Sequence, residues 1–504
     1  RAELRQRLED VHQLTEGFFA PDAAPVAQPD WGANITGRWQ SYPALRSPRA
    51  TQIFARLMPG IMRKLKEAAK PDDALAQFDT FLSGLPAGVQ LFSLFEANPQ
   101  LTGLIVDICA TAPALAQYLS RNAGVLDAVI GGSFFADWPG QAGLEADLAA
   151  VLARAEDYEA QLVATRRWAK EWHFRVGVHH LRGLIDAATA GRQYADLAAA
   201  VLTTLSPAVV AAFAVKHGPM PGRGGTVIAM GSLGAGALTA TSDLDLIMVY
   251  DAEGVEVSDG PRPLAARAYF ARLTQALVTA LSAPMAEGRL YEVDMRLRPS
   301  GRQGPVATSL QAFRDYQRSE AWTWEHLALT RARTLAGAPD LLADIDEFRE
   351  TLLREKSDGP TILADVADMR RRIGAAKTGT GPLDPKIGAG HLQDIALFAQ
   401  TAGLRAGSAV RDITGQLDAG VASGWIKAAD ARALDQTARL WWAVQMTGRL
   451  LTGGALDLDQ MALGVERMVL RETGHADVAT LARALKAQSA TADQIITGYL
   501  GGSE

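Results

Sequence analysis

The chain has 504 residues, of which 48% are hydrophobic and 21% are charged, and its formal net charge is −6. This composition excludes a disordered chain and is typical of a globular protein with roughly two to four domains, while the negative charge gives no support for nucleic-acid or membrane-surface binding. The single cysteine, Cys109, excludes an internal disulfide framework and favours a reducing, cytoplasmic compartment, and no run of about 18 consecutive apolar residues predicts a membrane span.

The N-terminal part of the chain shows apolar side chains at helical spacing and no residue pattern typical of catalysis. Because the chain starts without Met inside such a pattern, we assign residues 1–20 to the tail helix of an upstream domain. Residues 21–45 contain several prolines and glycines and are predicted to be a linker. Residues 46–145 predict a helical bundle, in which Pro59 should end or kink the first helix.

Residues 146–360 contain the only strong strand signals and are predicted to form a catalytic domain. Residues 226–230 predict a short buried strand that runs into a turn at Gly231 and Ser232, and residues 242–250 predict a second strand rich in branched apolar side chains. The backbone N–H groups of the turn and the Ser232 hydroxyl suit a phosphate chain.

Two aspartates open the second of these strands. Because residues i and i+2 of a strand point to the same side, Asp243 and Asp245 share one face while Leu244 and Leu246 pack behind them. Neighbouring carboxylates repel each other, and a hard divalent cation such as Mg²⁺ is the usual compensation. The strands and their turn therefore indicate metal-assisted phosphoryl or nucleotidyl transfer.

A later segment, residues 291–298, alternates strictly between apolar and polar side chains and predicts another strand. Its polar face carries Glu292, Asp294, Arg296 and Arg298. A neighbouring strand of this kind places Asp294 beside the first two aspartates, which would complete a three-carboxylate metal site with arginines for phosphate oxygens. The alternative is an edge strand with one solvated face.

Two helices are predicted next, over residues 309–319 and 321–335. We interpret Trp322 and Trp324 on the second helix as core side chains. Three charged residues of the same helix fit either an internal ion-pair network or a phosphate grip, and the sequence leaves both open: Glu325, Arg331 and Arg333.

The remaining residues, 361–504, predict a C-terminal helical bundle. A glycine-rich segment, residues 378–390, interrupts it, with Lys386 and His391 at its end. A lone histidine such as His391 is usually structural.

The order Gly231-Ser232, Asp243-x-Asp245 and a later Asp294 is similar to the polymerase-beta-like nucleotidyltransferase superfamily. Longer stretches resemble the glutamine synthetase adenylyltransferase family, namely residues 233–247, 290–301 and 320–333. The resemblance implies an α+β fold that is mostly α, with a small mixed sheet and its helices flanked by N- and C-terminal helical bundles. It also implies that the chain is the C-terminal, adenylylating half of a bifunctional enzyme, together with the central linker.

The implied reaction moves AMP from ATP to a tyrosine hydroxyl of glutamine synthetase and releases pyrophosphate, which would regulate nitrogen assimilation. On this resemblance Asp243, Asp245 and Asp294 are catalytic and hold Mg²⁺, while the triphosphate of ATP is held by Gly231, Ser232, Arg296 and Arg298. The implied partners are glutamine synthetase as substrate, with the PII signal protein and glutamine as regulators, and neither nucleic acid nor a membrane.

The chain departs from the family at a few positions. The family has Lys after the first glycine and an acid a few residues on, where this chain has Ser232 and Ala237. It also lacks a family glutamate at Ala396, two residues after Asp394. Three alternatives stay open: phosphorolytic deadenylylation of adenylyl-glutamine synthetase, nucleotide transfer to an RNA end or an antibiotic, and a non-catalytic docking module.

Overall fold

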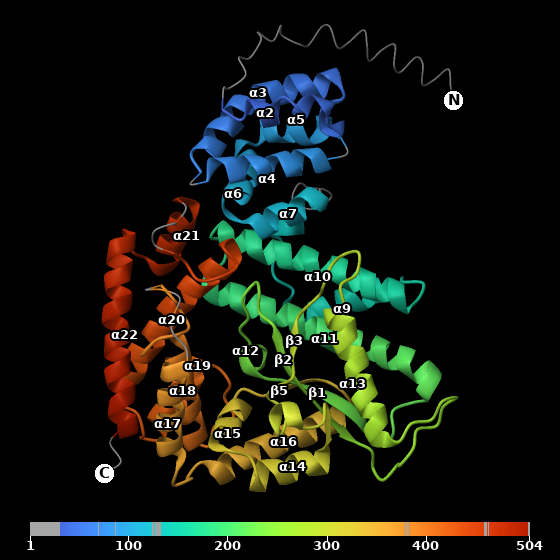
Figure 1. The fold of residues 1–504 in the computed structure, drawn as a ribbon, viewed down its shortest axis with the longest axis vertical. Coiled ribbons are helices and arrows are strands. Elements are labelled where there is room, and N and C mark those ends of the chain that lie inside the picture. The colour runs from blue at the N-terminus through green and yellow to red at the C-terminus, as the bar shows by residue number, and fades with distance from the viewer. Residues whose placement is uncertain are drawn as a thin grey trace. The chain divides into compact units, whose positions relative to one another are not determined.

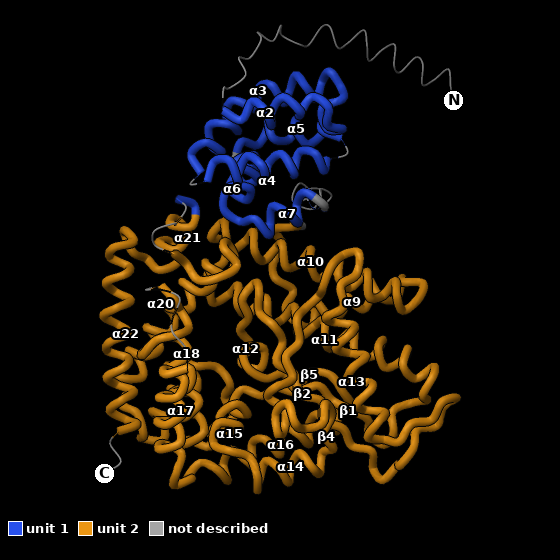
Figure 2. The backbone as a smooth tube through the Cα atoms, viewed as in Figure 1, with its two compact units in different colours: residues 1–126, 462–464 blue, residues 127–461, 465–504 orange. Residues whose placement is uncertain are grey.

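The structure is a computed structural model, and it describes residues 31–68, 70–85, 87–122, 125, 133–376, 379, 381, 383–457, 461 and 463–501. The chain divides into two compact units, residues 1–126 with 462–464, and residues 127–461 with 465–504 (Figure 2). The finer divisions predicted near residues 145 and 360 stay predictions. The predicted helix within residues 1–20 lies outside the described residues.

The first unit is a small all-helical bundle. Its elements are α2 (Ala33–Thr36), η1 (Trp39–Ser41), η2 (Pro43–Leu45), α3 (Pro48–Lys66), α4 (Pro71–Gly84), α5 (Val89–Ala97), α6 (Pro99–Thr111) and α7 (Pro113–Arg121). Residues 31–45, predicted as linker, form helical turns instead, because Trp39 is buried and its indole N–H donates to Asp79 Oδ1 at 2.9 Å. Helix α3 continues through Pro59, so the prediction that this proline ends the helix is wrong.

The second unit holds the sheet and the remaining helices (Figure 1). Its elements, with the α21 residues that fall in the first unit, are η3 (Ser133–Phe135), α9 (Gly140–Leu152), α10 (Tyr158–Leu181), α11 (Ala187–His217), β1 (Gly224–Ala229), α12 (Gly231–Gly234), β2 (Leu244–Asp251), α13 (Ala266–Ser282), β3 (Val293–Asp294), η4 (Gly301–Gln303), β4 (Ala307–Ser309), α14 (Leu310–Ser319), α15 (Thr323–Leu329), β5 (Arg333–Ala336), α16 (Pro339–Lys356), α17 (Ile362–Ala376), α18 (Leu392–Arg405), α19 (Ile413–Ala422), α20 (Ala428–Leu451), α21 (Leu463–Thr473) and α22 (Val478–Gly501). The prediction of a mostly helical α+β chain with a small mixed sheet is confirmed.

The sheet has the order β3-β2-β1-β5, and β4 pairs with the same edge of β2 as β3 does, further along the strand. Strand β1 is antiparallel to both β2 and β5, whereas β3 and β4 are parallel to β2. The strands predicted at 226–230 and 242–250 are thus confirmed as β1 and β2, each shifted by one or two residues.

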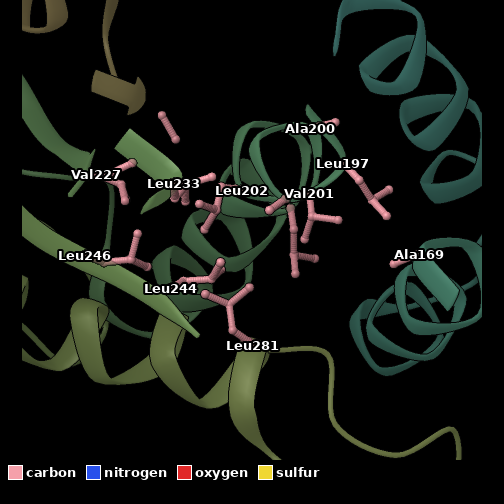
Figure 3. Close-up of a cluster of buried hydrophobic side chains, with 14 of the residues drawn as sticks. Ala169, Leu197, Ala200, Val201, Leu202, Val227, Leu233, Leu244, Leu246 and Leu281 are labelled. Atoms are coloured by element: carbon pink, nitrogen blue, oxygen red, sulfur yellow. The ribbon is translucent and has the colours of Figure 1, made fainter. Parts of the chain in front are cut away.

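Alternation along β1 and β2 divides their side chains between two cores. Figure 3 shows Val227, Leu244 and Leu246 on the face of the sheet that packs against helix α11. Leu202 of that helix belongs to the same cluster. The intervening side chains, Ile228 and Ile247 among them, pack on the other face against α14, α15 and α16. The sheet is therefore covered on both faces, and Asp245 belongs by register to the face of Ile247.

Helix α11 is long and apolar enough to cross a membrane by length and composition alone. It packs against α9, α10, α13 and α20, and its residues from Leu197 to Leu202 are completely buried in the core beside the sheet. The buried residues of this apolar helix are part of the core of the second unit.

The helix predicted over residues 321–335 is wrong in its second half. Helix α15 ends at Leu329, and residues 333–336 form β5 on the free edge of β1, with Ile228 opposite Thr334. Buried Arg349 fixes this change of direction, because its guanidinium donates to the carbonyls of Leu329 at 2.8 Å and Thr330 at 2.5 Å. An open sheet edge and a distant arginine, not local propensity, decide the conformation.

Candidate active site

The turn after β1 lies directly against the first aspartates. Gly231 has φ +54°, and a Cβ atom at this position would lie 2.2 Å from Asp245 Oδ2. The N–H of Met230 donates to the carbonyl of Asp245 at 2.8 Å, which fixes the turn to the start of β2. A glycine is needed here for two reasons, the left-handed backbone and the close approach of the carboxylate.

The parallel pairing of β2 and β3 brings the third aspartate to the first two. Asp294 is the register partner of Asp245, and the N–H of Leu244 donates to the carbonyl of Glu292 at 2.9 Å. Asp243 lies one residue before β2 and is exposed. Burial and then the charges of Asp243 and Asp294 raise the pKa of Asp245 from 3.8 to about 6. The register brings Asp294 beside Asp245, as predicted, and a site made by all three aspartates stays a prediction.

Arg296 holds the third carboxylate. The Asp294 carboxylate accepts from the backbone N–H of Arg296 at 2.8 Å and from its Nε at 2.6 Å. These bonds lower the pKa of Asp294. Among the described residues no three His, Cys, Asp or Glu side chains are arranged as a bound metal ion would need. The hard carboxylate oxygens fit Mg²⁺ by their chemistry, and the raised pKa of Asp245 marks negative charge without full compensation.

A strand was predicted over residues 291–298, but β3 contains only Val293 and Asp294, so the predicted length is wrong. After Asp294 the chain turns, because the guanidinium of Arg298 donates to the carbonyls of Met295 at 2.8 Å, Arg302 at 3.2 Å and Gly304 at 3.2 Å. Arg298 thus braces a turn and does not share a strand face with Asp294.

A cavity of about 1710 Å³ opens beside these residues, larger than the roughly 300–1,000 Å³ of a typical small-molecule site. We call it the central cavity. Gly231, Ser232, Asp243 and Asp245 line it, and helices α11, α15, α17, α18 and α20 supply other walls. The cavity has room for a nucleotide together with part of a second substrate.

Most residues that line the central cavity were not among the predicted site residues, and Trp324, Arg331 and Lys386 are examples. The interpretation of Trp322 and Trp324 as core is wrong, since these side chains are 71% and 41% exposed. Glu325 does not pair with the arginines; its carboxylate accepts from the Tyr316 hydroxyl at 2.8 Å and the N–H of Trp322 at 3.0 Å. In the sequence, the signal for Trp324 and Arg331 was a cluster of charges and aromatics, whereas Lys386 stood out only by its place at the end of a glycine-rich segment.

Comparison with known proteins adds the family. Residues 102–348 match the family described as glutamate-ammonia ligase adenylyltransferase. This part of the chain, just under half of its length, is similar to that family.

Curated relatives in this family are called bifunctional glutamine synthetase adenylyltransferase/adenylyl-removing enzyme. The relative from Mesorhizobium japonicum is 38% identical over 461 residues, which cover 89% of this chain and 46% of the relative. The relative from Brucella suis is 39% identical, with 88% of this chain and 46% of the relative covered. That from Rhodopseudomonas palustris is 35% identical, with 98% and 50% covered. The chain therefore spans about half the length of the curated relatives it matches.

Asp394, which the sequence resemblance singled out, has an arginine partner in the structure. The Asp394 carboxylate accepts from Arg370 Nε at 2.7 Å and from Arg370 Nη2 at 2.8 Å, and it also accepts from the N–H of Gly390 at 2.8 Å. Ala396, the position of the departure predicted from the sequence, lines the central cavity.

The charge on Asp245 predicts a stability effect in metal-free buffer. Its raised pKa means that the folded chain binds this proton more tightly than the unfolded chain, so wild-type stability falls as pH rises from about 4 to above 6. Asp245→Asn removes the cost of holding this charged carboxylate in the folded chain. We expect the substitution to raise the free energy of unfolding by about 1–2 kcal/mol at pH 7.5 and to leave it unchanged near pH 3. Thermal unfolding at both pH values measures this.

The matched control is Asp294→Asn. Arg296 lowers the pKa of Asp294, so the charged form is favoured in the folded chain and its loss should decrease stability at pH 7.5. Two variants that shift the melting temperature in the same direction would contradict the assigned charges.

Proposed function

We propose that this chain transfers AMP from ATP to a tyrosine hydroxyl of glutamine synthetase and releases pyrophosphate, on a polymerase-beta-like nucleotidyltransferase core. The observation that carries the proposal is the meeting of Asp243, Asp245 and Asp294 next to the Gly231-Ser232 turn, at a cavity large enough for two substrates. The chain matches about half of each curated relative, and the names of these relatives suggest the protein substrate and the two reactions, adenylyl transfer and adenylyl removal.

In the proposed reaction the tyrosine oxygen forms a bond to the α-phosphorus, and the bond from that phosphorus to the bridging oxygen of the β-phosphate breaks. Mg²⁺, which Asp243, Asp245 and Asp294 would hold, supplies positive charge for the phosphate oxygens. Gly231 and Ser232 would contact the triphosphate through backbone N–H groups and the hydroxyl. The protein's part is largely positioning and charge neutralisation.

Asp294 is the proposed acceptor of the tyrosine proton. The bonds from Arg296 make it a weak base in the present arrangement, because they lower its pKa. Arg296 is exposed and would release Asp294 to reach a phosphate of ATP. Arg298 would act indirectly, by holding the turn that follows Asp294.

Glutamine synthetase is the proposed protein substrate, and the PII signal protein and glutamine are the proposed regulators, in the cytoplasm. These partners rest on the resemblance alone. The second candidate reaction is phosphorolysis of adenylyl-tyrosine to ADP, favoured by the words "adenylyl-removing enzyme" in the names of the relatives.

The test is mass spectrometry of glutamine synthetase after incubation with this chain, ATP and Mg²⁺. We expect the gain of one AMP on a tyrosine, and no gain when the α,β-bridging oxygen of ATP is replaced by a methylene group, because that bond must break. A parallel incubation of adenylylated glutamine synthetase with phosphate measures the second candidate reaction, in which phosphate attacks the adenylyl phosphorus, ADP forms and the tyrosine hydroxyl is released. AMP loss and ADP formation without any AMP gain would assign the chain to deadenylylation instead.

A further inference from the structure

The central cavity contains two cations that the predicted site does not use. Five basic side chains line it: Arg192, Arg331, Lys386, Arg439 and Arg449. Three of them are engaged, Arg192 with the Thr189 hydroxyl at 2.9 Å, Arg439 with Asp435 at 2.7 Å, and Arg449 with the Gly453 carbonyl at 3.2 Å. Within the described part of the chain, no hydrogen bond or ion pair engages the side chains of Arg331 and Lys386.

Arg331 lies directly beneath the glycine turn. It stands between α15 and β5, and a Cβ atom on Gly234 would lie 2.1 Å from its carbonyl oxygen, so its backbone touches α12. Its Nε is buried without a hydrogen-bond partner. Burial lowers the pKa of Arg331 to about 10, which still leaves the guanidinium charged at neutral pH. The residue is partly exposed where it lines the cavity, and an anionic ligand there could accept from the guanidinium.

Lys386 comes from a wall far away in sequence, and its backbone is fixed. Asp384 Oδ1 accepts from the N–H of Lys386 at 2.9 Å and from that of Ile387 at 2.9 Å. The carbonyl of Asp384 lies 2.7 Å from Nδ1 of His391, whose ring packs 4.2 Å from that of buried Trp441. Lys386 lines the same cavity as Asp243 and Asp245.

In the ligand-free chain the two arginines predicted to hold phosphate are both engaged, Arg296 by Asp294 and Arg298 by backbone carbonyls, so each would first have to leave these partners. The available positive charge of the cavity therefore comes from the segment after α15 and from the segment before α18. Both cations line the same cavity as Asp243 and Asp245.

We propose that Arg331 and Lys386 form a subsite for the β- and γ-phosphates of ATP and for the pyrophosphate that leaves. The inference rests on the proposed function and names the residues that would hold the leaving group. A polyphosphate with several negative charges fits two cations that line one cavity, because each oxygen can accept from a separate donor. In this arrangement the aspartates act at the α-phosphate, and the two cations bind the β- and γ-phosphates.

The test is equilibrium binding of ATP, AMP and inorganic pyrophosphate to the wild type and to Arg331→Gln and Lys386→Gln. We expect each variant to bind ATP and pyrophosphate about tenfold more weakly and AMP within twofold of the wild type. Arg449→Gln, in the same cavity, is the matched control and should leave all three affinities unchanged. Arg331→Lys and Lys386→Arg should recover most of the ATP affinity, since each restores the charge.

Thermal unfolding separates binding from structure. Arg331→Gln should not lower the melting temperature of the ligand-free chain, because it removes an unpaired charge, while the stabilisation by pyrophosphate should shrink. Should Arg331→Gln fail to fold, Lys386→Gln still tests the subsite on its own. If the wild type binds ATP and pyrophosphate and both variants bind them equally well, the subsite is overturned and the proposed function is not. Wild-type chain that binds neither would remove the proposed function and the subsite together.

Discussion

Asp243→Asn and Asp245→Asn should each reduce AMP transfer to glutamine synthetase by about a thousandfold or more. Asn keeps the size of the side chain and loses its charge, so the phosphate chain and the attacking oxygen lose the charge compensation that the proposed reaction needs. The rate of AMP incorporation at saturating ATP and Mg²⁺ measures the effect.

Asp251→Asn is the matched control, because Asp251 ends the same strand β2 on the far side from the cavity. Asp251 pairs with Arg223 at 3.2 Å, and Arg223 keeps Asp340 and Asp344 as partners after the substitution. We expect this variant to retain activity within about threefold. If Asp243→Asn or Asp245→Asn kept a tenth of the wild-type rate, that carboxylate would not belong to the metal-holding set.

Gly231→Ala should reduce AMP transfer by about a hundredfold while the chain stays folded. The new Cβ atom would lie 2.2 Å from Asp245 Oδ2, and the carboxylate at the end of a short flexible side chain must turn away. A displacement of about 1 Å in a positioned reacting group is enough for a loss of this size.

Gly236→Ala separates this displacement from backbone strain. Gly236 lines the same cavity with φ +76°, and a Cβ atom there would meet nothing within 4 Å. Both alanines carry the cost of a left-handed backbone, about 1–2 kcal/mol, so both should lower the melting temperature alike. Only Gly231→Ala should lose activity beyond about threefold. Equal losses in the two variants would show that strain in the loop, and not the position of Asp245, controls the rate.

Local signals predicted the central strands well. Branched apolar residues bounded by glycines predicted β1 and β2, and the period of two correctly placed Leu244 and Leu246 behind the aspartates. Asp294 was expected beside Asp245 from a strict alternation, and the register of β2 and β3 confirms that placement.

The same alternation predicted too long a strand. Pairing stops after Asp294, because Arg296 and Arg298 bond to the turn itself and leave no ladder to continue. Alternation reports which side chains can share a face, but a strand also needs a partner strand along its whole length. Residues 333–336 show the reverse case, since a helical pattern became a strand where β1 offered a free edge.

By itself, the sequence determined the aspartates, the glycine turn and the alternation of apolar side chains, because these follow from local geometry and from residue chemistry. The tertiary structure alone decided which charges are available to a ligand. Arg296, Arg298 and Arg331 look equivalent in the sequence, yet the first holds Asp294, the second holds backbone carbonyls, and the third has a buried Nε without a partner. Partners that lie far apart in the chain become neighbours only through folding, so a charge can be assigned to a ligand only after its own contacts are known.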